Sequence, residues 1–208
     1  MNKIKNHNAL LSHGDIESRR IVLDIAEQTL SRLDSYTQIH DLAYLDGSVL
    51  YIGNKNWDLS KKRNVYLIGA GKACNAMIKA FEEILGVFLT RGIAIIKVKE
   101  QSDLFHNTDV YIGGHPLPNE EGLRASEEIL RLIDSASPDD LFIILISGGS
   151  SALMSCPIDG ISLEDEIITT DILLKSGANI FEINAIRRHI SKLNGGRLAE
   201  LIRNVGPN

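Results

Sequence analysis

The sequence has few cysteines, no long run of cations and no long hydrophobic run. Its 208 residues contain two cysteines, Cys74 and Cys156, which are too few for a disulfide framework or for a metal site built from cysteine. Each stands beside a glycine-rich turn. We expect both cysteines to be small buried residues, and the alternative is that one thiol lies close to a ligand. We expect the protein to be located in a reducing cytoplasm.

Positive charge is also scarce. The sequence contains 22 Lys and Arg residues and 27 Asp and Glu residues, so the formal net charge is −5. Its longest cationic run is Lys61-Lys62-Arg63. Binding to the backbone of a nucleic acid requires clustered cations, so we expect no nucleic-acid partner. A small phosphorylated ligand needs only a local pocket and is compatible with an acidic chain.

Hydrophobic runs are short. None approaches the roughly 20 residues that cross a bilayer, so no membrane span is expected. The N-terminal segment 1–15 has neither an apolar core nor a small-residue cleavage site, and so does not match a secretory signal. With 44% hydrophobic and 24% charged residues, the composition is typical of a globular protein with a sizeable core.

The hydrophobic pattern changes near residue 64. Residues 1–64 predict a helix after the capping sequence Ser-His-Gly-Asp (12–15), and then a hairpin over 42–53 with its turn at Asp46-Gly47. We expect this part to pack on a main domain formed by residues 65–208.

In residues 65–208 predicted strands alternate with predicted helices. The strands are expected over 65–69, 92–98, 109–118 and within 140–154, and the helices over 73–86, from Asn119, after the capping box 162–165, and over 181–202. The apolar run in 140–154 predicts a strand covered on both faces. Leu163, Ile167 and Leu174 are the expected apolar side of the helix after 162–165. This alternation predicts an α/β fold with a parallel, doubly wound sheet.

Three glycine-rich turns follow predicted strands. They are Gly69-Ala70-Gly71-Lys72, Gly113-Gly114-His115-Pro116 and Ser147-Gly148-Gly149-Ser150-Ser151. In a parallel sheet the carboxyl ends of the strands share one edge, where ligands collect and backbone can approach a phosphate closely. The serine hydroxyls would add donors. We therefore predict an anion site at this edge.

Neither familiar nucleotide motif is complete. A P-loop needs four residues between its first glycine and Gly-Lys, and the dinucleotide fingerprint needs a third glycine where Cys74 stands. Lys72 places a cation at the N-terminus of a helix, where positive charge is unfavourable. A surface lysine would explain it, but we favour an anion bound there by Lys72. His115 is either a structural hydrogen-bonder or a ligand contact that carries a proton.

The predicted last helix, 181–202, carries polar residues opposite an isoleucine seam. Asn184, Arg187 or Arg188, and Ser191 are spaced to share one face. An arginine fork suits a carboxylate or a phosphate, so we predict a ligand role for this face. Glu182 is either a surface acid or an acid that faces the site.

These motifs resemble the type II glycerate 2-kinase family, some members of which are described as hydroxypyruvate reductases. The resemblance is carried by residues 69–73, 113–126, 140–154 and 173–199 and extends from about Val65 to Ala199. It implies a Rossmann-like N-terminal domain followed by a second α/β domain. It also implies transfer of the γ-phosphoryl group of ATP to the 2-hydroxyl of D-glycerate, with Mg²⁺ or another divalent cation.

The resemblance also implies roles for residues. Lys72 matches the catalytic lysine of the family, and the Ser147–Ser151 turn and the Asn184/Arg187 helix line the cleft between domains. Two departures stand out. Asn194 replaces a lysine, which Lys192 could compensate, and the resemblance implies a second domain that would follow Asn208. We therefore expect an N-terminal portion that is inactive alone, with self-association or the missing domain as its partner.

Two other functions stay open at this point. One is a hydroxypyruvate reductase-like oxidoreductase, against which the absent third glycine and the missing acid at the end of strand 92–98 both count. The other is a non-catalytic module that binds a phosphate ligand. Glycerate, ATP and a divalent ion are the ligands that the kinase hypothesis expects, with no metal ligand assigned to the chain itself.

Overall fold

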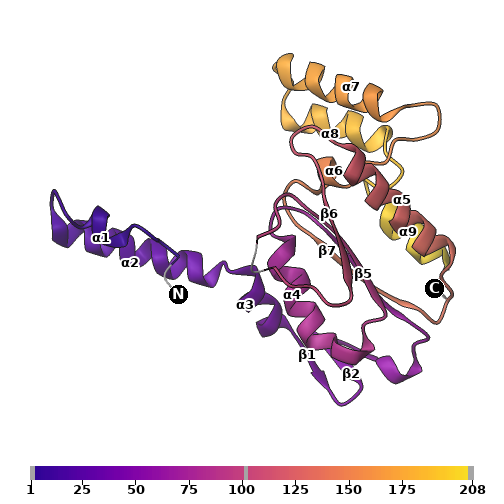
Figure 1. Ribbon diagram of the computed structural model, residues 1–208, viewed down its shortest axis with the longest axis horizontal. Helices are drawn as coiled ribbons and strands as arrows, with labels where there is room; N and C mark the ends of the chain where they lie inside the picture. Colours follow the sequence, from indigo (N-terminus) through magenta and orange to yellow (C-terminus); the bar gives the residue numbers. More distant parts are fainter. Residues whose placement is uncertain (1–2, 101–102, 206–208) are drawn as a thin grey trace.

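A parallel sheet forms the centre of the computed structural model, which describes residues 3–100 and 103–205. Its strands lie in the order β6-β5-β4-β7 (Figure 1). They are β4 (Val65–Ala70), β5 (Arg91–Ile96), β6 (Thr108–Ile112) and β7 (Leu141–Ile146). All three neighbouring pairs are parallel, which confirms the predicted α/β fold. The predicted division into residues 1–64 and 65–208 stays a prediction, and residues 1–2, 101–102 and 206–208 of these ranges lie outside the described chain.

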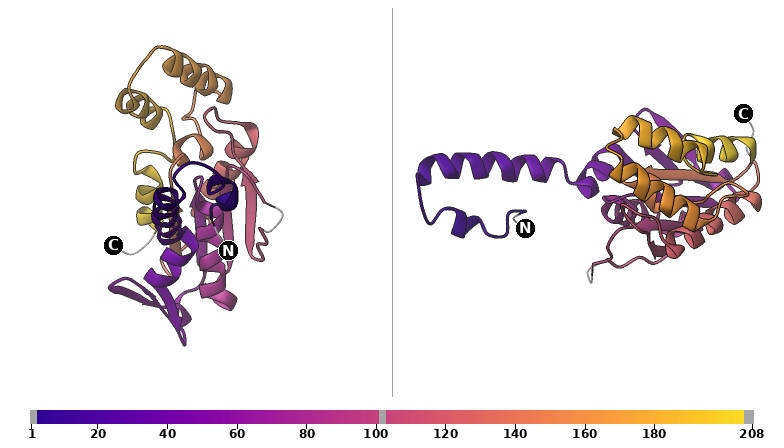
Figure 2. Two further views of the ribbon diagram at one scale, coloured as in Figure 1. Left: turned by 90° about the vertical axis from the view of Figure 1, so that its left-hand side faces the viewer. Right: turned by 90° about the horizontal axis from the view of Figure 1, so that it is seen from above.

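Helices cover both faces of the sheet, as alternation along β4 requires. Val65 and Leu67 pack in one cluster with α4 (Cys74–Leu85). Tyr66 and Ile68 pack in another with α5 (Glu120–Asp134) and α9 (Arg197–Val205). The two layers are separated by the sheet in Figure 1 and in the turned views of Figure 2.

The most buried strand is β4, and β7 lies at an edge. Every residue of β4 is buried, whereas Ile146 at the end of β7 is 49% exposed. The prediction that the 140–154 strand is covered on both faces is nevertheless confirmed. Ile143 and Leu145 pack in the cluster with α4, and Phe142 and Ile144 pack against the cluster with α5 and α9. Strand order decides that, within the described residues, β4 pairs with a strand on each side and β7 with one.

The predicted hairpin is confirmed. β1 (Ala43–Asp46) pairs antiparallel with β2 (Val49–Ile52), and Gly47 takes a φ of 59° in the turn between them. A third strand that was not predicted, β3 (Lys55–Asp58), pairs with β2. Leu50 joins the core beside α4, so this small sheet packs on the main one. Short 3₁₀ turns, Leu59–Lys61 and Gly86–Phe88, follow β3 and α4.

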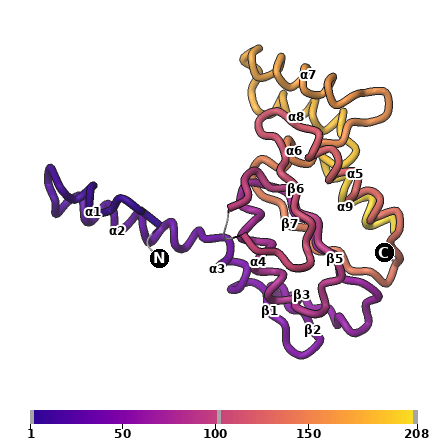
Figure 3. The backbone as a smooth tube through the Cα atoms, in the orientation of Figure 1, coloured from indigo at the N-terminus to yellow at the C-terminus, as the bar shows by residue number. Residues whose placement is uncertain are grey.

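The N-terminal helices form an arm that extends away from the sheet (Figures 1 and 3). It consists of α1 (His7–Leu10) and α2 (Ile16–Arg32), neither of which contains a buried residue. The shorter α3 (Ser35–Leu42) follows and packs on α4. The helix after residue 15 is confirmed, but Asp15 caps it by accepting the amides of Glu17 and Ser18, so the capping box with Ser12 is wrong.

The predicted helix over 181–202 is two helices. α8 (Ile180–His189) ends before a turn in which Gly195 and Gly196 have φ values of 71° and 92°, and α9 begins after it. Ser191 is buried in this turn and forms an isolated bridge with Pro157. The predicted polar face therefore holds Asn184 and Arg187 but not Ser191.

Two more helices precede α8. α6 (Ser150–Leu153) follows β7, and α7 (Leu163–Lys175) begins with the predicted capping box of Ser162 and Asp165. The buried side of α7 is Glu166 and Thr170, not the predicted apolar side. α7 and α8 pack on each other beyond the end of the sheet (Figure 1). No helix in the described parts of the chain combines the length and apolar character that a membrane span requires.

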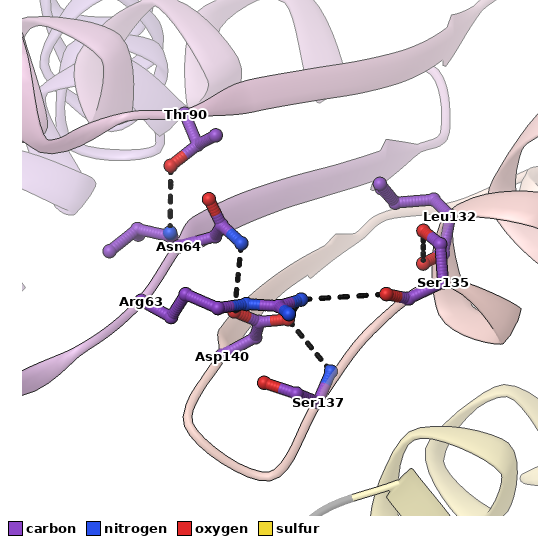
Figure 4. A network of polar contacts seen from close by, with 8 residues as sticks. Arg63, Asn64, Thr90, Leu132, Ser135, Ser137 and Asp140 are labelled. Carbon is purple, nitrogen blue, oxygen red and sulfur yellow. Dashed lines mark hydrogen bonds and ion pairs between the residues drawn. The ribbon is translucent and has the colours of Figure 1, made fainter.

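An ion pair fixes the edge strand to the centre of the sheet (Figure 4). Asp140, just before β7, accepts hydrogen bonds from Arg63 Nε at 3.0 Å and Nη2 at 2.6 Å, and from Asn64 at 2.9 Å. The Ser137 amide also donates to this carboxylate, whose side chain is 0% exposed. Burial opposes ionisation, but these donors hold the pKa of Asp140 below its usual range.

Candidate active site

The three glycine-rich turns lie at one edge of the sheet. Each follows a strand of the parallel set, namely β4, β6 and β7, so all three stand at carboxyl ends. α6 and α8 lie at the same end (Figure 3). The sheet thus has the geometry on which the predicted anion site depends.

The turns after β4 and β7 are bonded to each other. The Lys72 amide donates to the Gly148 carbonyl at 3.0 Å, and the Ala73 amide donates to Ser147 Oγ at 3.1 Å. A β-carbon on Gly71, whose φ is 139°, would collide with Ser147 Oγ. Close approach therefore explains Gly71 without a ligand, and the amides of Lys72 and Ala73 are already used by the protein. Phosphate binding by Gly69 and Gly71 stays a prediction.

Gly69 serves packing in a similar way. A β-carbon there would collide with Cys74 Sγ and lie 2.8 Å from Ile78 Cδ1. Cys74 stands where the dinucleotide fingerprint has its third glycine, and it is fully buried under β4. Both cysteines are free and buried, which confirms the simpler explanation for them.

Lys72 and His115 converge on Gly149. A β-carbon built on Gly149 would lie 3.0 Å from Lys72 Cε and 2.9 Å from His115 Cδ2. The three residues come from the three different turns, so the turns form one site rather than three. Gly149 has a φ of 92°, which favours glycine in addition to the crowding.

The free backbone donors of the site lie in the turn after β7. Within the described residues, the amides of Gly148 and Gly149 donate no hydrogen bond to the protein. Gly148 is exposed, and a β-carbon on it would meet nothing within 4 Å, so there is open space beside its α-carbon. Together with Lys72, these amides offer donors to an anion.

Arg187 connects α8 to the same site. Its Nη2 donates to the Pro116 carbonyl at 3.2 Å, beside His115. Arg187 also lines a cavity of about 380 Å³ whose other walls are Ser150, Ser151, Phe181, Asn184, Arg188, Asn194 and Gly195. A second cavity, of about 1010 Å³, is lined by Lys72, Asn75 and Lys97 among others. Of the predicted site residues, Lys72 lines the larger cavity, and five line the smaller one, namely Ser150, Ser151, Asn184, Arg187 and Arg188.

Two predicted site residues are engaged elsewhere. Glu182 accepts the Asn179 amide at 2.9 Å and completes the capping box of α8. Lys192 pairs with Asp159 at 2.6 Å, which raises the pKa of Lys192. The structure gives each a local partner, and their ligand roles stay predictions. Ser147 is likewise turned toward Gly71 and Ala73.

The site is cationic, and this affects His115. Burial first, and then the charges of Lys72, Lys97 and Arg187, lower the pKa of His115 below its ordinary value. A lowered pKa keeps the imidazole neutral at neutral pH, so that one ring nitrogen can accept a proton. Within the described residues no group of three or more His, Cys, Asp or Glu side chains is arranged to hold a metal ion.

Sequence analysis missed Lys97 and Glu166, and it noted Asn194 only as the replacement for a family lysine. Lys97 follows β5 at the same edge, so the rule that selected the glycine turns could have found it. Asn194 is 8% exposed and donates to Ser191 Oγ at 3.0 Å and the Ser151 carbonyl at 3.3 Å, so it braces the turn that ends α8. Glu166 on α7 is 2% exposed, and nothing in the sequence pattern indicated that it is buried.

Comparison with known proteins identifies the family. Residues 21–206 match the family described as "Domain of unknown function (DUF4147)". Glycerate 2-kinase of Pyrococcus horikoshii is 38% identical over 191 residues, which cover 92% of this chain and 42% of the relative. Human glycerate kinase is 33% identical and covers 92% of this chain and 40% of the relative.

Solved structures agree with this assignment. A crystal structure of a Pyrococcus horikoshii protein has a TM-score of 0.77 and 38% identity, covering 89% of this chain and 41% of that one. Glycerate kinase of Thermotoga maritima has a TM-score of 0.62 and 38% identity, covering 67% of this chain and 34% of that one. The chain spans about two fifths of the length of these relatives. The matched residues, the fold and the sequence identity together show that the chain belongs to the glycerate 2-kinase family, DUF4147.

Proposed function

We propose that this chain supplies the ligand-binding half of an ATP-dependent kinase that phosphorylates the 2-hydroxyl of D-glycerate to give 2-phospho-D-glycerate. The observation that carries the proposal is that Lys72 and His115 converge on Gly149, while Arg187 binds the Pro116 carbonyl beside His115, in a chain of this family. Three cationic or proton-accepting groups from three elements suit a substrate that carries a carboxylate, a hydroxyl and a phosphoryl donor.

Each residue has a distinct role in this proposal. Arg187 binds the carboxylate of D-glycerate through the donors of its planar fork that Pro116 does not use. His115, held neutral, accepts the proton of the 2-hydroxyl. Lys72 binds phosphoryl oxygens as a point charge, and the Gly148 and Gly149 amides donate to the same oxygens.

The donor set fits a nucleotide better than a metal held by the protein. Lys72 and Lys97 line the larger cavity and would hold the phosphates of ATP. When bound, ATP supplies the phosphoryl group and its Mg²⁺ neutralises charge on the transferred oxygens. A cytoplasmic location accords with two free, buried cysteines. Since the relatives are more than twice as long, we infer that these residues bind ligands alone and that turnover requires the remainder.

An oxidoreductase is the second candidate, because the name of one relative, from Agrobacterium vitis, contains the activity hydroxypyruvate reductase. The structure disfavours nicotinamide binding at the turn after β4. Its amides are bonded to the turn after β7, and Cys74 fills the position of the third glycine. β5 is followed by Lys97 rather than by an acid that would bind a ribose.

Isothermal titration of this chain with D-glycerate, ATP–Mg²⁺ and NADH tests the proposal. We expect the first two to bind and NADH not to bind. Lys72→Met should weaken ATP–Mg²⁺ binding about tenfold or more, since a charge-assisted contact is lost. Lys55→Met, at an exposed position of β3 that does not line this cavity, should not. Binding of NADH alone would support the oxidoreductase, and binding of phosphate ligands without glycerate would support a non-catalytic module.

The position of phosphorylation is tested by turnover. Residues 65–205 replace the matching part of the Pyrococcus horikoshii glycerate 2-kinase, and the product is examined by ³¹P NMR. We expect 2-phosphoglycerate, and a product phosphorylated at the 3-hydroxyl would contradict the assignment.

A further inference from the structure

Asn194 is a buried amide in the wall of the smaller cavity, and the proposed chemistry does not use it. The residue lies in the turn between α8 and α9, is 8% exposed, and lines the cavity of about 380 Å³ together with Arg187. A buried side-chain amide usually pairs both of its ends, because an unpaired polar group loses its hydration without compensation. The partners of the two ends therefore indicate what the residue does.

The nitrogen of the Asn194 side chain is bound by the protein. Nδ2 lies 3.0 Å from Ser191 Oγ, 3.3 Å from the Ser151 carbonyl oxygen and 3.4 Å from the Met154 carbonyl oxygen. Backbone carbonyls only accept hydrogen bonds, so the nitrogen has to face them and the side-chain oxygen has to face away. The Asn194 backbone amide also donates to Ser191 Oγ, at 3.1 Å, so main chain and side chain are both held.

The oxygen of the same side chain has no protein partner. Within the described residues Asn194 Oδ1 accepts no hydrogen bond, and the buried side-chain polar atoms without a partner are Ser126 Oγ and Ser137 Oγ. Oδ1 is therefore not sealed from solvent, and the small exposed surface of Asn194 lines the cavity. An acceptor with a fixed orientation is thus available to a molecule bound there.

The other polar groups of the cavity wall differ from this acceptor. Arg187 and Arg188 carry donors only, and the two serine hydroxyls of the wall can turn to donate or accept. The side chain of Asn184 forms no hydrogen bond within the described residues, so neither of its ends is fixed. Asn194 Oδ1 is set in advance, and a fixed acceptor suits a ligand group that donates, such as a hydroxyl.

We propose that Asn194 Oδ1 accepts a hydrogen bond from the 3-hydroxyl of the acid substrate and thereby selects an acid that carries a second hydroxyl group. This inference rests on the proposed function, in which Arg187 binds the carboxylate and the 2-hydroxyl is phosphorylated. Arg187 and Asn194 line one cavity, so a three-carbon acid can contact both. Asn194 acts in substrate specificity and takes no proton.

Calorimetric titration of this chain with D-glycerate and with D-lactate, which lacks the 3-hydroxyl, tests the proposal. The wild-type chain should bind D-glycerate about tenfold more tightly, because D-lactate leaves the acceptor unpaired. Asn194→Leu is similar in size but has no acceptor, and should bring the ratio of the two dissociation constants close to one. A wild-type ratio close to one would overturn the proposal.

Ser191→Ala is the matched control. Ser191 is 0% exposed, accepts from Asn194 Nδ2 and does not line the cavity. The change removes one contact of the nitrogen and leaves the two carbonyls that orient Oδ1. It should lower the melting temperature but keep the preference for D-glycerate. An equal loss of that preference in Ser191→Ala and Asn194→Leu would give Asn194 a structural role only and contradict the proposal.

A measurement on the wild-type chain decides the role of Asn194 even where Asn194→Leu fails to fold. The ¹³Cγ NMR signal of Asn194, assigned through its own backbone, should shift on addition of D-glycerate and much less on addition of D-lactate, because a hydrogen bond polarises the carbonyl. Equal shifts with both acids would refute the contact and leave carboxylate binding by Arg187 intact. Failure to bind either acid would overturn the proposed function, and this inference with it.

Discussion

At the scale of single residues, the neighbours Gly148 and Gly149 show how differently two glycines are used. A β-carbon on Gly148 would meet open space, whereas one on Gly149 would press against Lys72 and His115. Gly149 also takes a left-handed φ of 92°. Gly149 is therefore required by both conformation and space, and Gly148 by neither.

Gly149→Ala should reduce both stability and ligand binding. The left-handed conformation of an alanine costs about 1–2 kcal/mol, which corresponds to a fall of about 4 °C in the melting temperature. The new methyl group should also displace Lys72 and weaken ATP–Mg²⁺ binding. Thermal unfolding and calorimetry measure the two effects, with Gly148→Ala as the control for stability. An unchanged melting temperature for Gly149→Ala would contradict the strain argument.

The cysteines should be unreactive in the folded chain. Burial raises the pKa of Cys74 to about 12 and that of Cys156 to about 11, so almost no thiolate exists at pH 8. Ellman's reagent at pH 8 should therefore label neither thiol rapidly, and both should react in concentrated guanidinium. Rapid labelling without denaturant would show that one thiol reaches solvent.

At the scale of elements, the edge strand β7 depends on a loop contact. Arg63 and Asn64, just before β4, hold Asp140, just before β7. This contact aligns the two strands whose carboxyl ends carry Lys72 and the Ser147–Ser151 turn. The distant network thus supports the register of the site.

Asp140→Asn should destabilise the fold and alter its acid sensitivity. The folded pKa of Asp140 is lowered, so its contribution to stability is present above the unfolded value near 3.8 and is lost as the pH falls through the folded value. At pH 7 the variant should lose about 2 kcal/mol, since its charged hydrogen bonds are weakened.

Urea unfolding between pH 3 and pH 7 measures this contribution. The difference between wild type and Asp140→Asn should shrink toward pH 3. The adjacent exposed residue Asp139 provides the control, and Asp139→Asn should follow the wild type at each pH. A difference that stays constant with pH would show that the charge of Asp140 is not the cause.

At the scale of the whole molecule, sequence patterns predicted the features that contiguous residues form. The turn Gly69–Lys72 was placed correctly because strand, turn and helix are contiguous. The edge position of β7 could not be predicted, because strand order is set by pairing between distant segments. The break after His189 was hidden because Ile186, Ile190 and Leu193 keep helical spacing through it. Asn184 and Arg187 were selected from a helix that is shorter than expected.

The contacts of the site were beyond prediction for the same reason. That three turns share one edge follows from parallel strands, but the convergence of Lys72 and His115 on Gly149 depends on side-chain packing. The Arg187–Pro116 contact joins residues 71 positions apart. Glu166 lies on a face that its apolar neighbours did not indicate.

The N-terminal arm should be separable from the fold. α2 contains no buried residue and exposes Ile21, Val22 and Ile25. A chain that begins at Asp34 should therefore keep its melting temperature to within about 2 °C and bind less bis-ANS, a dye that reports exposed apolar surface. A large fall in melting temperature would show that the arm packs on the sheet in solution.

The close packing of Ser147 against Gly71 affects how the protein can be engineered. The hydroxyl of one turn occupies the volume that any other side chain in the second turn would need. Libraries that randomise either segment alone will mostly yield misfolded clones. Exchanging both segments together as a single cassette, taken from one donor, is the practical way to graft a new preference onto this scaffold.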